Sequence, residues 1–309
     1  MLCCRCREER HIRPRGSSFT RVLNSSSPTA RYDPKKKRVW ATTHWGQMKL
    51  LLSEIEFLTP YYGKEFHVIY AGASPGVHIP VLARMFPTMK FILVDPQPSM
   101  MTYRQCPNTE VVEARMTNEL AREFASRDWG GRLLFISDVR TGENGSSETD
   151  EEQQERIHRD MMAQKEWVEI LQPKLSVLKF RLPWAKGCTE YLNGKIHQPV
   201  YGKQLTHETR LFVPRGAKTI EYDHGMYEGQ MAFFNQVIRH SLYYFAGRSM
   251  CFDCTSFRRI VGEYMRSTAG RRIRNEEIDH RCHEIEIELN ERMHQWRRIR
   301  DQQRSEPGT

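Results

Sequence analysis

Four charged residues lie in or beside apolar stretches of the sequence, where a charge is costly unless an opposite charge compensates it. Lys49 lies in GQMKLLLSE, Asp138 follows RLLFIS, Lys179 lies in SVLKF, and Glu208 precedes TRLFV. Two lysines and two carboxylates compensate one another if the fold brings them together. An amine in such a group can orient a weak hydroxyl nucleophile and assist its loss of a proton.

One of the two amines would take that step, the carboxylates would direct it, and the other amine would hold it in the useful protonation state through like-charge repulsion. Taken singly, each of the four is an ordinary surface or salt-bridged charge, so the prediction depends on their meeting. This chemistry requires no metal.

A glycine-containing turn joins a β-rich run to a helical pattern. The run is HVIYA, the turn spans Gly72 to Gly76, and the periodic segment VHIPVLARMF precedes the next apolar run, FILVD. At the end of the first strand of a doubly wound sheet, such a turn brings the backbone close to a ligand, and the following helix N-terminus faces an anionic group. Pro75 would stiffen the turn.

This turn and the residue that ends the next strand point to adenosylmethionine. Gly72 and Gly76 leave room for its carboxyl, amino and thioether groups, and Asp95 is placed to accept hydrogen bonds from its ribose hydroxyls. Nucleotide-binding dehydrogenases favour a G-x-G-x-x-G spacing that this turn lacks. A purely structural turn is the remaining alternative, because glycine-rich strand ends are common in α/β proteins.

The elements that would position these residues alternate between helices and strands, which predicts an α/β fold with a central, mostly parallel sheet. Helical spacing of apolar residues predicts a helix over 45–58. Thr149 and Glu152 can form a capping box that opens a second helix reaching Leu171. Strands are expected over 132–138, 176–180 and 208–213.

Composition and charge restrict the partners. The chain has 309 residues, 39% of them hydrophobic, and a formal net charge of +9, so a polyanion such as nucleic acid is the expected partner. No apolar run approaches the roughly 18 residues needed to cross a bilayer, and no apolar segment near the start resembles a signal peptide. We therefore expect an intracellular protein without membrane contact.

The chain divides into three predicted parts. Residues 1–31 read as a flexible basic arm, 32–265 as the α/β domain, and 266–309 as a charged tail. Apolar residues recur every three or four positions in the tail, which predicts a long amphipathic helix seeking a partner surface. They are Ile278, Cys282, Ile285, Leu289, Met293 and Trp296.

The cysteines allow two interpretations. Cys251, Cys254 and Cys282, with His280 or His283, have a spacing compatible with zinc, whereas Cys3, Cys4 and Cys6 are too crowded for a regular site. We favour free buried thiols, and no metal site is assigned.

The order and context of these pieces resemble the cap-specific mRNA (nucleoside-2′-O-)-methyltransferase family of poxviruses and other large DNA viruses, whose members also serve as regulatory subunits of viral poly(A) polymerase. The similarity runs from about Tyr32 to about His240 and includes GQMKLLLSE, YAGASPGVHI, ISDVR, LKFRLPW, HETRLF and YEGQMAFFNQVIR. It implies a Rossmann-like methyltransferase fold, adenosylmethionine as cofactor, capped mRNA as substrate, and a heterodimer with a poly(A) polymerase catalytic subunit. It also implies a viral protein that works in the host cytoplasm and is packaged in the virion.

The resemblance assigns site residues as well. Lys49, Asp138, Lys179 and Glu208 match the Lys-Asp-Lys-Glu set of RNA ribose 2′-O-methyltransferases, with Lys179 central. The family has an arginine where this chain has Gln97, so one cofactor contact is altered. The implied cofactor contacts are Gln47, Tyr70, Gly72, Pro75, Gly76, His78, Asp95, Gln97, Arg115, Met116, Thr117 and Asp138.

For the cap, the resemblance matches Tyr32 and Trp184 to the aromatic pair that sandwiches the methylated guanine. A positively charged purine stacks strongly between electron-rich rings, although either aromatic alone would be read as a packed ring. Glu228 matches the acid that reads the guanine edge, and a second family acid is here Lys186, which leaves the pocket one carboxylate short. Arg140 and Arg181 are expected to contact RNA phosphates.

Two other functions stay open at this point. The chain could act mainly as a non-catalytic, RNA-tethering subunit of a poly(A) polymerase, with the methyltransferase fold as a scaffold. It could also methylate an internal ribose of rRNA or tRNA. Retention of all four catalytic residue types argues against a loss of activity.

Overall fold

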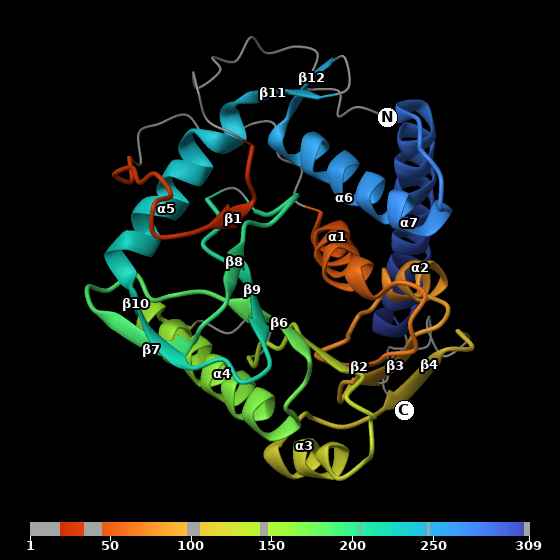
Figure 1. The fold of residues 1–309 in the computed structure, drawn as a ribbon. Coiled ribbons are helices and arrows are strands. Elements are labelled where there is room, and N and C mark those ends of the chain that lie inside the picture. The colour runs from red at the N-terminus through yellow and green to blue at the C-terminus, as the bar shows by residue number, and fades with distance from the viewer. Residues whose placement is uncertain are drawn as a thin grey trace.

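The structure is a computed structural model that describes residues 19–33, 45–97, 106–142, 148–203, 205–245 and 248–305. An eight-stranded sheet with the order β1-β8-β9-β6-β5-β2-β3-β4 runs through the molecule (Figure 1). Its strands are β1 (Val22–Leu23), β2 (His67–Ala71), β3 (Lys90–Val94), β4 (Thr109–Val112), β5 (Leu133–Ser137), β6 (Leu175–Phe180), β8 (Lys195–His197) and β9 (Thr209–Pro214).

The strands β4, β3, β2, β5 and β6 are parallel to their neighbours, which confirms the predicted α/β fold with a mostly parallel sheet. The chain order reverses between β2 and β5, and ligands of such sheets bind beyond the carboxyl ends of the strands at this reversal. The strand β9 was expected to continue the alternation, but it runs antiparallel to β6, and β8 and β1 follow it antiparallel.

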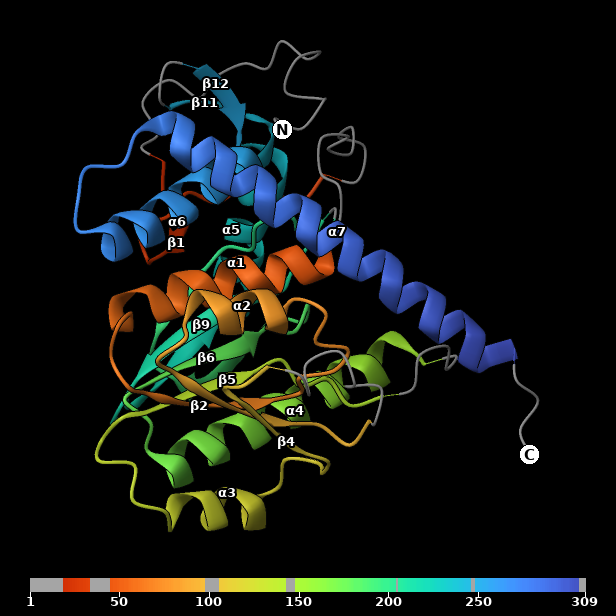
Figure 2. The same ribbon diagram turned by 90° about the vertical axis from the view of Figure 1, so that its right-hand side faces the viewer.

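Helices cover both faces of the sheet (Figure 2). One face carries α1, α2, α6 and α7, and the other carries α3 and α4, with α5 contributing to the same cluster as α3 and α4. The helices are α1 (Gly46–Leu58), α2 (Ile79–Met85), α3 (Asn118–Ala125), α4 (Asp150–Leu171), α5 (His224–Gln236), α6 (Phe252–Ala269) and α7 (Asn275–Ser305), with short 3-10 helices at Thr59–Tyr61 and Ile238–His240. Two hairpin-like pairs complete the fold, β7 (Cys188–Leu192) with β10 (Thr219–Asp223) and β11 (Leu242–Phe245) with β12 (Arg248–Cys251).

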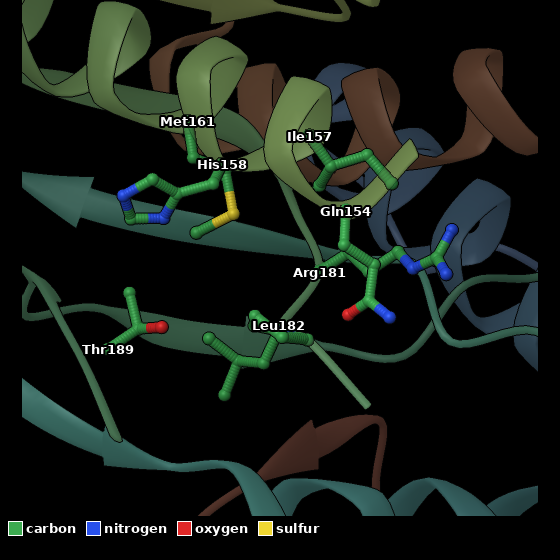
Figure 3. Close-up of a pocket in the computed structure, with 8 residues that line it drawn as sticks. Gln154, Ile157, His158, Met161, Arg181, Leu182 and Thr189 are labelled. Carbon is green, nitrogen blue, oxygen red and sulfur yellow. The ribbon is translucent and has the colours of Figure 1, made fainter. Parts of the chain in front are cut away.

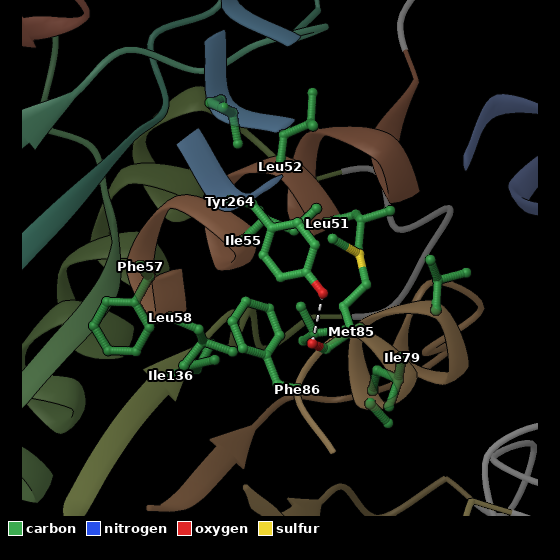
Figure 4. Packing of buried hydrophobic residues seen from close by; sticks show 14 of the residues in the cluster. Leu51, Leu52, Ile55, Phe57, Leu58, Ile79, Met85, Phe86, Ile136 and Tyr264 are labelled. Atoms are coloured by element: carbon green, nitrogen blue, oxygen red, sulfur yellow. Dashed lines mark hydrogen bonds between the residues drawn. The ribbon is translucent and has the colours of Figure 1, made fainter. Parts of the chain in front are cut away.

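The first core cluster explains why α1 forms where the sequence predicts it. Leu51, Leu52, Ile55 and Leu58 are fully buried. They pack against α2, α6 and the face of the sheet that these helices cover (Figure 4). In the same cluster the Tyr264 hydroxyl of α6 donates a hydrogen bond of 2.8 Å to the carbonyl of Met85, so this tyrosine satisfies its polar end inside an apolar layer.

The helix α4 begins at the predicted capping box. The Thr149 hydroxyl accepts a hydrogen bond from the Glu152 amide at 3.2 Å, and the Glu152 carboxylate accepts one from the Thr149 amide at 2.8 Å. A cap of this kind is worth about 1 kcal/mol because it satisfies amides that the first turn leaves unpaired.

The segments predicted as an N-terminal arm and a C-terminal tail contain regular elements. Within the predicted arm, β1 pairs with β8, and residues 1–18, including Cys3, Cys4 and Cys6, lie outside the described residues. The boundary placed after residue 265 falls inside α6, and α7 follows as one long helix. No helix among the described residues is long and apolar enough to cross a membrane.

Candidate active site

The four predicted charged residues meet at one edge of the sheet. Lys49 lies in the first turn of α1, Asp138 directly follows β5, Lys179 lies near the end of β6, and Glu208 directly precedes β9. Nζ of Lys179 lies 3.2 Å from Oδ1 of Asp138 and 3.8 Å from Oε2 of Glu208. Nζ of Lys49 lies 2.6 Å from Oε1 of Glu208. The mutual compensation expected from the sequence is therefore present.

A fifth charge, Arg210, joins this group and was missed from the sequence. Its guanidinium donates to Oδ1 of Asp138 at 2.6 Å and to Oε1 of Glu208 at 3.2 Å. Arg210 is only 5% exposed and lies directly opposite Lys179 in the β6–β9 register. The same signal that identified Lys179, a charge within an apolar strand, could have identified it.

Burial and neighbouring charges set the protonation of this group. Burial lowers the pKa of Lys179, although Asp138 and Glu208 act to raise it, and the like charges that lower it further are those of Arg140 and Arg210. Lys49, which was expected to repel it, is instead paired with Glu208.

The carboxylate of Glu208 is held in its charged form. Burial acts to raise its pKa, but the charges of Lys49, Lys179 and Arg210 outweigh burial and hold the pKa well below its ordinary value. For Asp138 burial likewise acts upward, and Lys179 and Arg210 bring the pKa below its ordinary value. The site therefore combines two charged carboxylates with an amine that loses its proton more readily than usual.

The glycine turn lies at the reversal between β2 and β5. Gly72 follows β2 with φ of +78°, and a Cβ added there would lie 2.9 Å from the Val139 amide nitrogen, so only glycine fits beside the segment that carries Asp138. Gly76 also has a positive φ, of +59°. The turn therefore packs closely against the segment that carries Asp138, at the strand ends where ligands of such sheets bind.

Asp95 supports this turn from the end of β3. One carboxylate oxygen accepts from the Ser74 amide at 3.0 Å, and the other accepts from the Gln97 amide at 3.0 Å. Each carboxylate oxygen has two acceptor positions, so Asp95 retains the capacity to accept from ribose hydroxyls.

A buried polar network lies behind the turn. Oε1 of Gln47 accepts from the His78 amide at 3.2 Å and contacts Nδ1 of His78 at 2.8 Å. Nε2 of His78 lies 2.9 Å from Glu54, which also accepts from the Tyr70 hydroxyl at 2.7 Å. Tyr70 was implied as a cofactor contact, and the structure places its side chain in the core with its hydroxyl engaged by Glu54. Gln47 and His78 instead link this core to the turn.

The remaining implied cofactor residues line the strand ends around the turn. Pro75 and Gly76 lie in the turn itself, and Gln97 is exposed two residues after Asp95. Past β4, Arg115 is exposed and Met116 is buried. Thr117 caps α3 by accepting a hydrogen bond from the Leu120 amide at 3.2 Å.

Trp184, one of the two aromatics matched to the cap, has one face covered. Its ring stacks on His207, with centroids 3.9 Å apart and planes at 21°, while Trp184 remains 42% exposed. Burial is the main cause that lowers the pKa of His207 to about 3, and the nearby Arg181 charge adds to it. A neutral imidazole thus supports the indole, a residue that sequence reasoning did not single out.

Tyr32 and Glu228 come together through α5. The Ala30 amide donates to the Gly229 carbonyl at 2.9 Å, which places the segment with Tyr32 beside Glu228. On the same helix, the Tyr227 hydroxyl donates to the His207 carbonyl at 2.7 Å and its ring meets the His207 ring edge-on. The first turns of α5 therefore join the two segments that carry the exposed aromatics.

The two arginines expected at RNA phosphates are partly buried beside α4. Nη1 of Arg181 donates to Oε1 of Gln153 at 3.3 Å, and the Trp184 amide donates to Oε1 of Gln154 at 2.9 Å. Nη1 of Arg140 lies 4.0 Å from Asp160. Arg181 and Gln154 also line a pocket between α4 and the segment after β6. Its lining residues are Gln154, Ile157, His158, Met161, Arg181, Leu182, Pro183 and Thr189 (Figure 3).

The remaining predicted positions lie outside the charged group. Lys186 is exposed, two residues after Trp184. The side chains of Cys251, Cys254 and Cys282 are buried. Within the described ranges, no three His, Cys, Asp or Glu side chains are grouped so that they could hold a metal ion.

The comparison with known families gives one match over most of this fold. The family model described as poly A polymerase regulatory subunit matches residues 21–255, which include every element from β1 to β12 and the whole charged group. The chain belongs to this family. The long helix α7 lies outside the matched range.

Similar curated proteins come from poxviruses. The cap-specific mRNA (nucleoside-2′-O-)-methyltransferase of Myxoma virus (strain Lausanne) is 26% identical over 217 residues, which are 64% of this chain and 63% of that protein. The protein of the same name from Fowlpox virus (strain NVSL) is 28% identical over 153 residues, 45% of this chain and 47% of its own length. The chain thus spans less than two thirds of the length of these relatives.

Solved structures resemble the chain only distantly. The structure of bluetongue virus VP4, described as a multifunctional RNA-capping production line, has 14% identity and a TM-score of 0.43 over 72% of this chain and 34% of VP4. A TM-score of this size supports no conclusion, and the fold assignment rests on the strand order of the sheet.

Proposed function

We propose that the protein is an adenosylmethionine-dependent methyltransferase that modifies the 2′-hydroxyl of capped mRNA. The observation that carries the proposal is the position of the Lys179 amine between Asp138 and Glu208, at the same sheet edge as the Gly72 turn. The names of the poxvirus relatives agree with this activity.

The residues of the turn and the strand ends fit the cofactor. Gly72, Gly76 and Asp95 would hold it, with Gln47 fixed by His78 at the back of the turn. When bound, adenosylmethionine supplies a methyl group on a sulfonium, which is already a good leaving group. The chain therefore chiefly has to align the hydroxyl oxygen and help remove its proton.

Lys179 performs that part of the reaction. Because burial lowers its pKa, its amine is available to hydrogen-bond the ribose hydroxyl and to take up the proton that the oxygen loses as its bond to the methyl carbon forms. Asp138 and Glu208 fix the direction of the amine, and Arg210 holds both carboxylates in place. Lys49 neutralises Glu208 from the other side.

We assign cap binding to the surface around the first turns of α5. The open face of Trp184 and the exposed ring of Tyr32 would enclose the methylated guanine, and Glu228 would accept from its edge. Arg140 and Arg181 would contact the phosphates that lead from the cap to the charged group.

The test is methyl transfer to capped, uncapped and structured RNA by the wild type and by Lys179→Ala. We expect transfer to the first ribose of capped RNA only, a loss of at least about 100-fold in Lys179→Ala, and unchanged adenosylmethionine affinity in that variant. The control is Lys195→Ala, an exposed lysine on β8. Substantial turnover by Lys179→Ala would remove its role. Equal transfer to uncapped or structured RNA would point to an internal ribose.

We also propose that the protein serves as a regulatory subunit of a viral poly(A) polymerase, because the matched family carries that description. Its partner would be the polymerase catalytic subunit, and processivity should survive Lys179→Ala, since docking and methyl transfer make different demands. Loss of both together in a folded variant would argue against separate roles.

The similarity to poxvirus proteins further supports the proposal that this protein acts inside an infected cell. We place it in the host cytoplasm and in the virion, which fractionation of infected cells and purified particles would test.

A further inference from the structure

The charge of α7 changes sign along its length. Residues 276–291 hold seven acidic residues and one arginine, whereas residues 292–302 hold four arginines and one acidic residue. A helix rises 1.5 Å per residue, so the basic part extends over roughly 15 Å. The two parts of the helix therefore suit different surroundings.

The acidic part is attached to the body of the protein. Ile278, Cys282, Ile285 and Leu289 are buried in the first core cluster. Asp279 pairs with Arg258 of α6 at 2.6 Å. Further along, Glu288 pairs with Arg84 of α2. These contacts place two of the acidic residues against arginines of other helices.

The basic part also packs against the first core cluster, through Met293 and Trp296, but among the described residues its arginines have no ion pair with another element. Arg297 and Arg298 are exposed, and neither has an ion-pair partner among the described residues. Arg300 lies over the ring of Trp296 at 4.9 Å and pairs only with its neighbour Asp301. Figure 2 shows this end of α7 extending past α1 and α2, on the side of the molecule where β2 ends and α1 begins. The segment that carries the two exposed arginines therefore belongs to the end of α7 that extends beyond α1 and α2.

We propose that the projecting end of α7, through Arg297 and Arg298, binds the phosphate backbone of single-stranded RNA downstream of the cap. Exposed arginines without acidic partners are suited to phosphates, and binding releases counterions from the RNA. The proposal rests on the proposed function only for the identity of the RNA. It gives the chain a contact with RNA outside the family-matched range and apart from the cap pocket.

The test is RNA binding by the full chain with Arg297→Gln and Arg298→Gln combined. A capped RNA of about 30 nucleotides should bind roughly tenfold more weakly in 0.1 M salt, and the slope of log K against log salt should fall by about 1.4, for two phosphate contacts on a single strand. A capped dinucleotide should bind as it does to the wild type, because it is too short to reach α7. Replacing both arginines by Glu should increase the loss.

The control pair is Arg122→Gln with Arg127→Gln, two exposed arginines in and directly after α3, which covers the opposite face of the sheet. Circular dichroism establishes that every variant is folded. An unchanged affinity for the long RNA, or an equal loss in the control pair, would overturn the proposal. Unchanged RNA binding with weaker association to the polymerase catalytic subunit would overturn it in favour of a protein surface.

The two proposals fail in different ways. If no RNA is methylated but the affinity for the long RNA still depends on Arg297 and Arg298, the proposed activity is wrong and the α7 contact is supported. If capped dinucleotides are methylated and the α7 variants bind long RNA normally, the activity stands and the α7 contact fails.

Discussion

The imidazole of His207 stacks on the indole of Trp184, with ring centroids 3.9 Å apart. His207 is 6% exposed and Trp184 is 42% exposed, so the stack has a buried end and an open end. On its other side the imidazole meets the ring of Tyr227 edge-on, with centroids 4.8 Å apart. The indole is therefore held in orientation before any ligand arrives, which reduces the entropy that a ligand must remove on binding.

Replacing His207 with Ala should weaken binding of a methylated cap analogue roughly fivefold, because one ring contact of about 1 kcal/mol no longer fixes the indole. Fluorescence titration of the Trp184 environment measures this affinity. His207→Phe is the matched control, since it keeps a flat neutral ring. Protonation of His207 should not alter the cap affinity of the wild type between pH 5 and 8, because a pKa of about 3 keeps the imidazole neutral over this range. A titration near pH 6.5 that disappears in His207→Phe would contradict this.

The pH dependence of methyl transfer should report Lys179. Its pKa lies below the ordinary value of 10.5, so the free amine, which takes up the hydroxyl proton, becomes populated at a lower pH than in an exposed lysine. The rate under saturating substrates should rise with pH and level off below pH 10.5. Lys179→Arg, whose guanidinium stays protonated, should lack this rise. A wild-type rate that is flat or falls with pH would show that the amine acts only in its charged form.

Arg210→Met should destabilise the fold by about 3 kcal/mol, because it leaves two buried carboxylates short of a partner. Denaturant unfolding measures this change. Arg210 is also one of the charges that lower the pKa of Lys179, so its loss should raise that pKa and move the rising limb of the rate profile to higher pH. Lys218→Met, at an exposed position, is the control. An unshifted limb in a folded variant would argue against direct coupling between Arg210 and Lys179.

His78→Phe should weaken adenosylmethionine binding roughly fivefold, since Gln47 would lose a hydrogen bond of about 1 kcal/mol that fixes its amide. Calorimetry with the cofactor measures the effect, and cap affinity should be unchanged. The exposed His280, changed to Phe on α7, serves as the control. Equal cofactor affinity in His78→Phe would show that the buried network does not orient Gln47.

Four members of the charged group could be predicted from the sequence because each lies in or beside an apolar run, and a buried charge requires a partner. Arg210 carries the same signal and was missed. The turn at Gly72 and the start of α4 at Thr149 were predictable for a similar reason, since both depend on local backbone chemistry. These features are encoded within a few residues of where they act.

Other features depend on contacts between distant segments. Nothing near His207 in the sequence indicates that it supports Trp184, because the loop after β6 and the residues before β9 meet only in the folded protein. The strand β4 was missed because three of its residues are only half-buried and Glu110 is exposed, so they show no strong apolar pattern. The antiparallel direction of β9 was missed because the apolar pattern of a buried strand does not indicate which way the strand runs in the sheet.

The register between β6 and β9 places Lys179 opposite Arg210. Because side chains alternate between the two faces of a sheet, an insertion or deletion of one residue inside either strand would turn one of these charges to the opposite face. The 28 residues that connect the strands, 181–208, include the Trp184 loop and can change in length without altering that pairing. A change of length between Trp184 and β8 can therefore alter the proposed cap-binding surface without moving Lys179 relative to Arg210, provided that Glu208 and the pairing of β8 with β9 stay in place. The choice of RNA and the proposed chemistry can thus evolve separately.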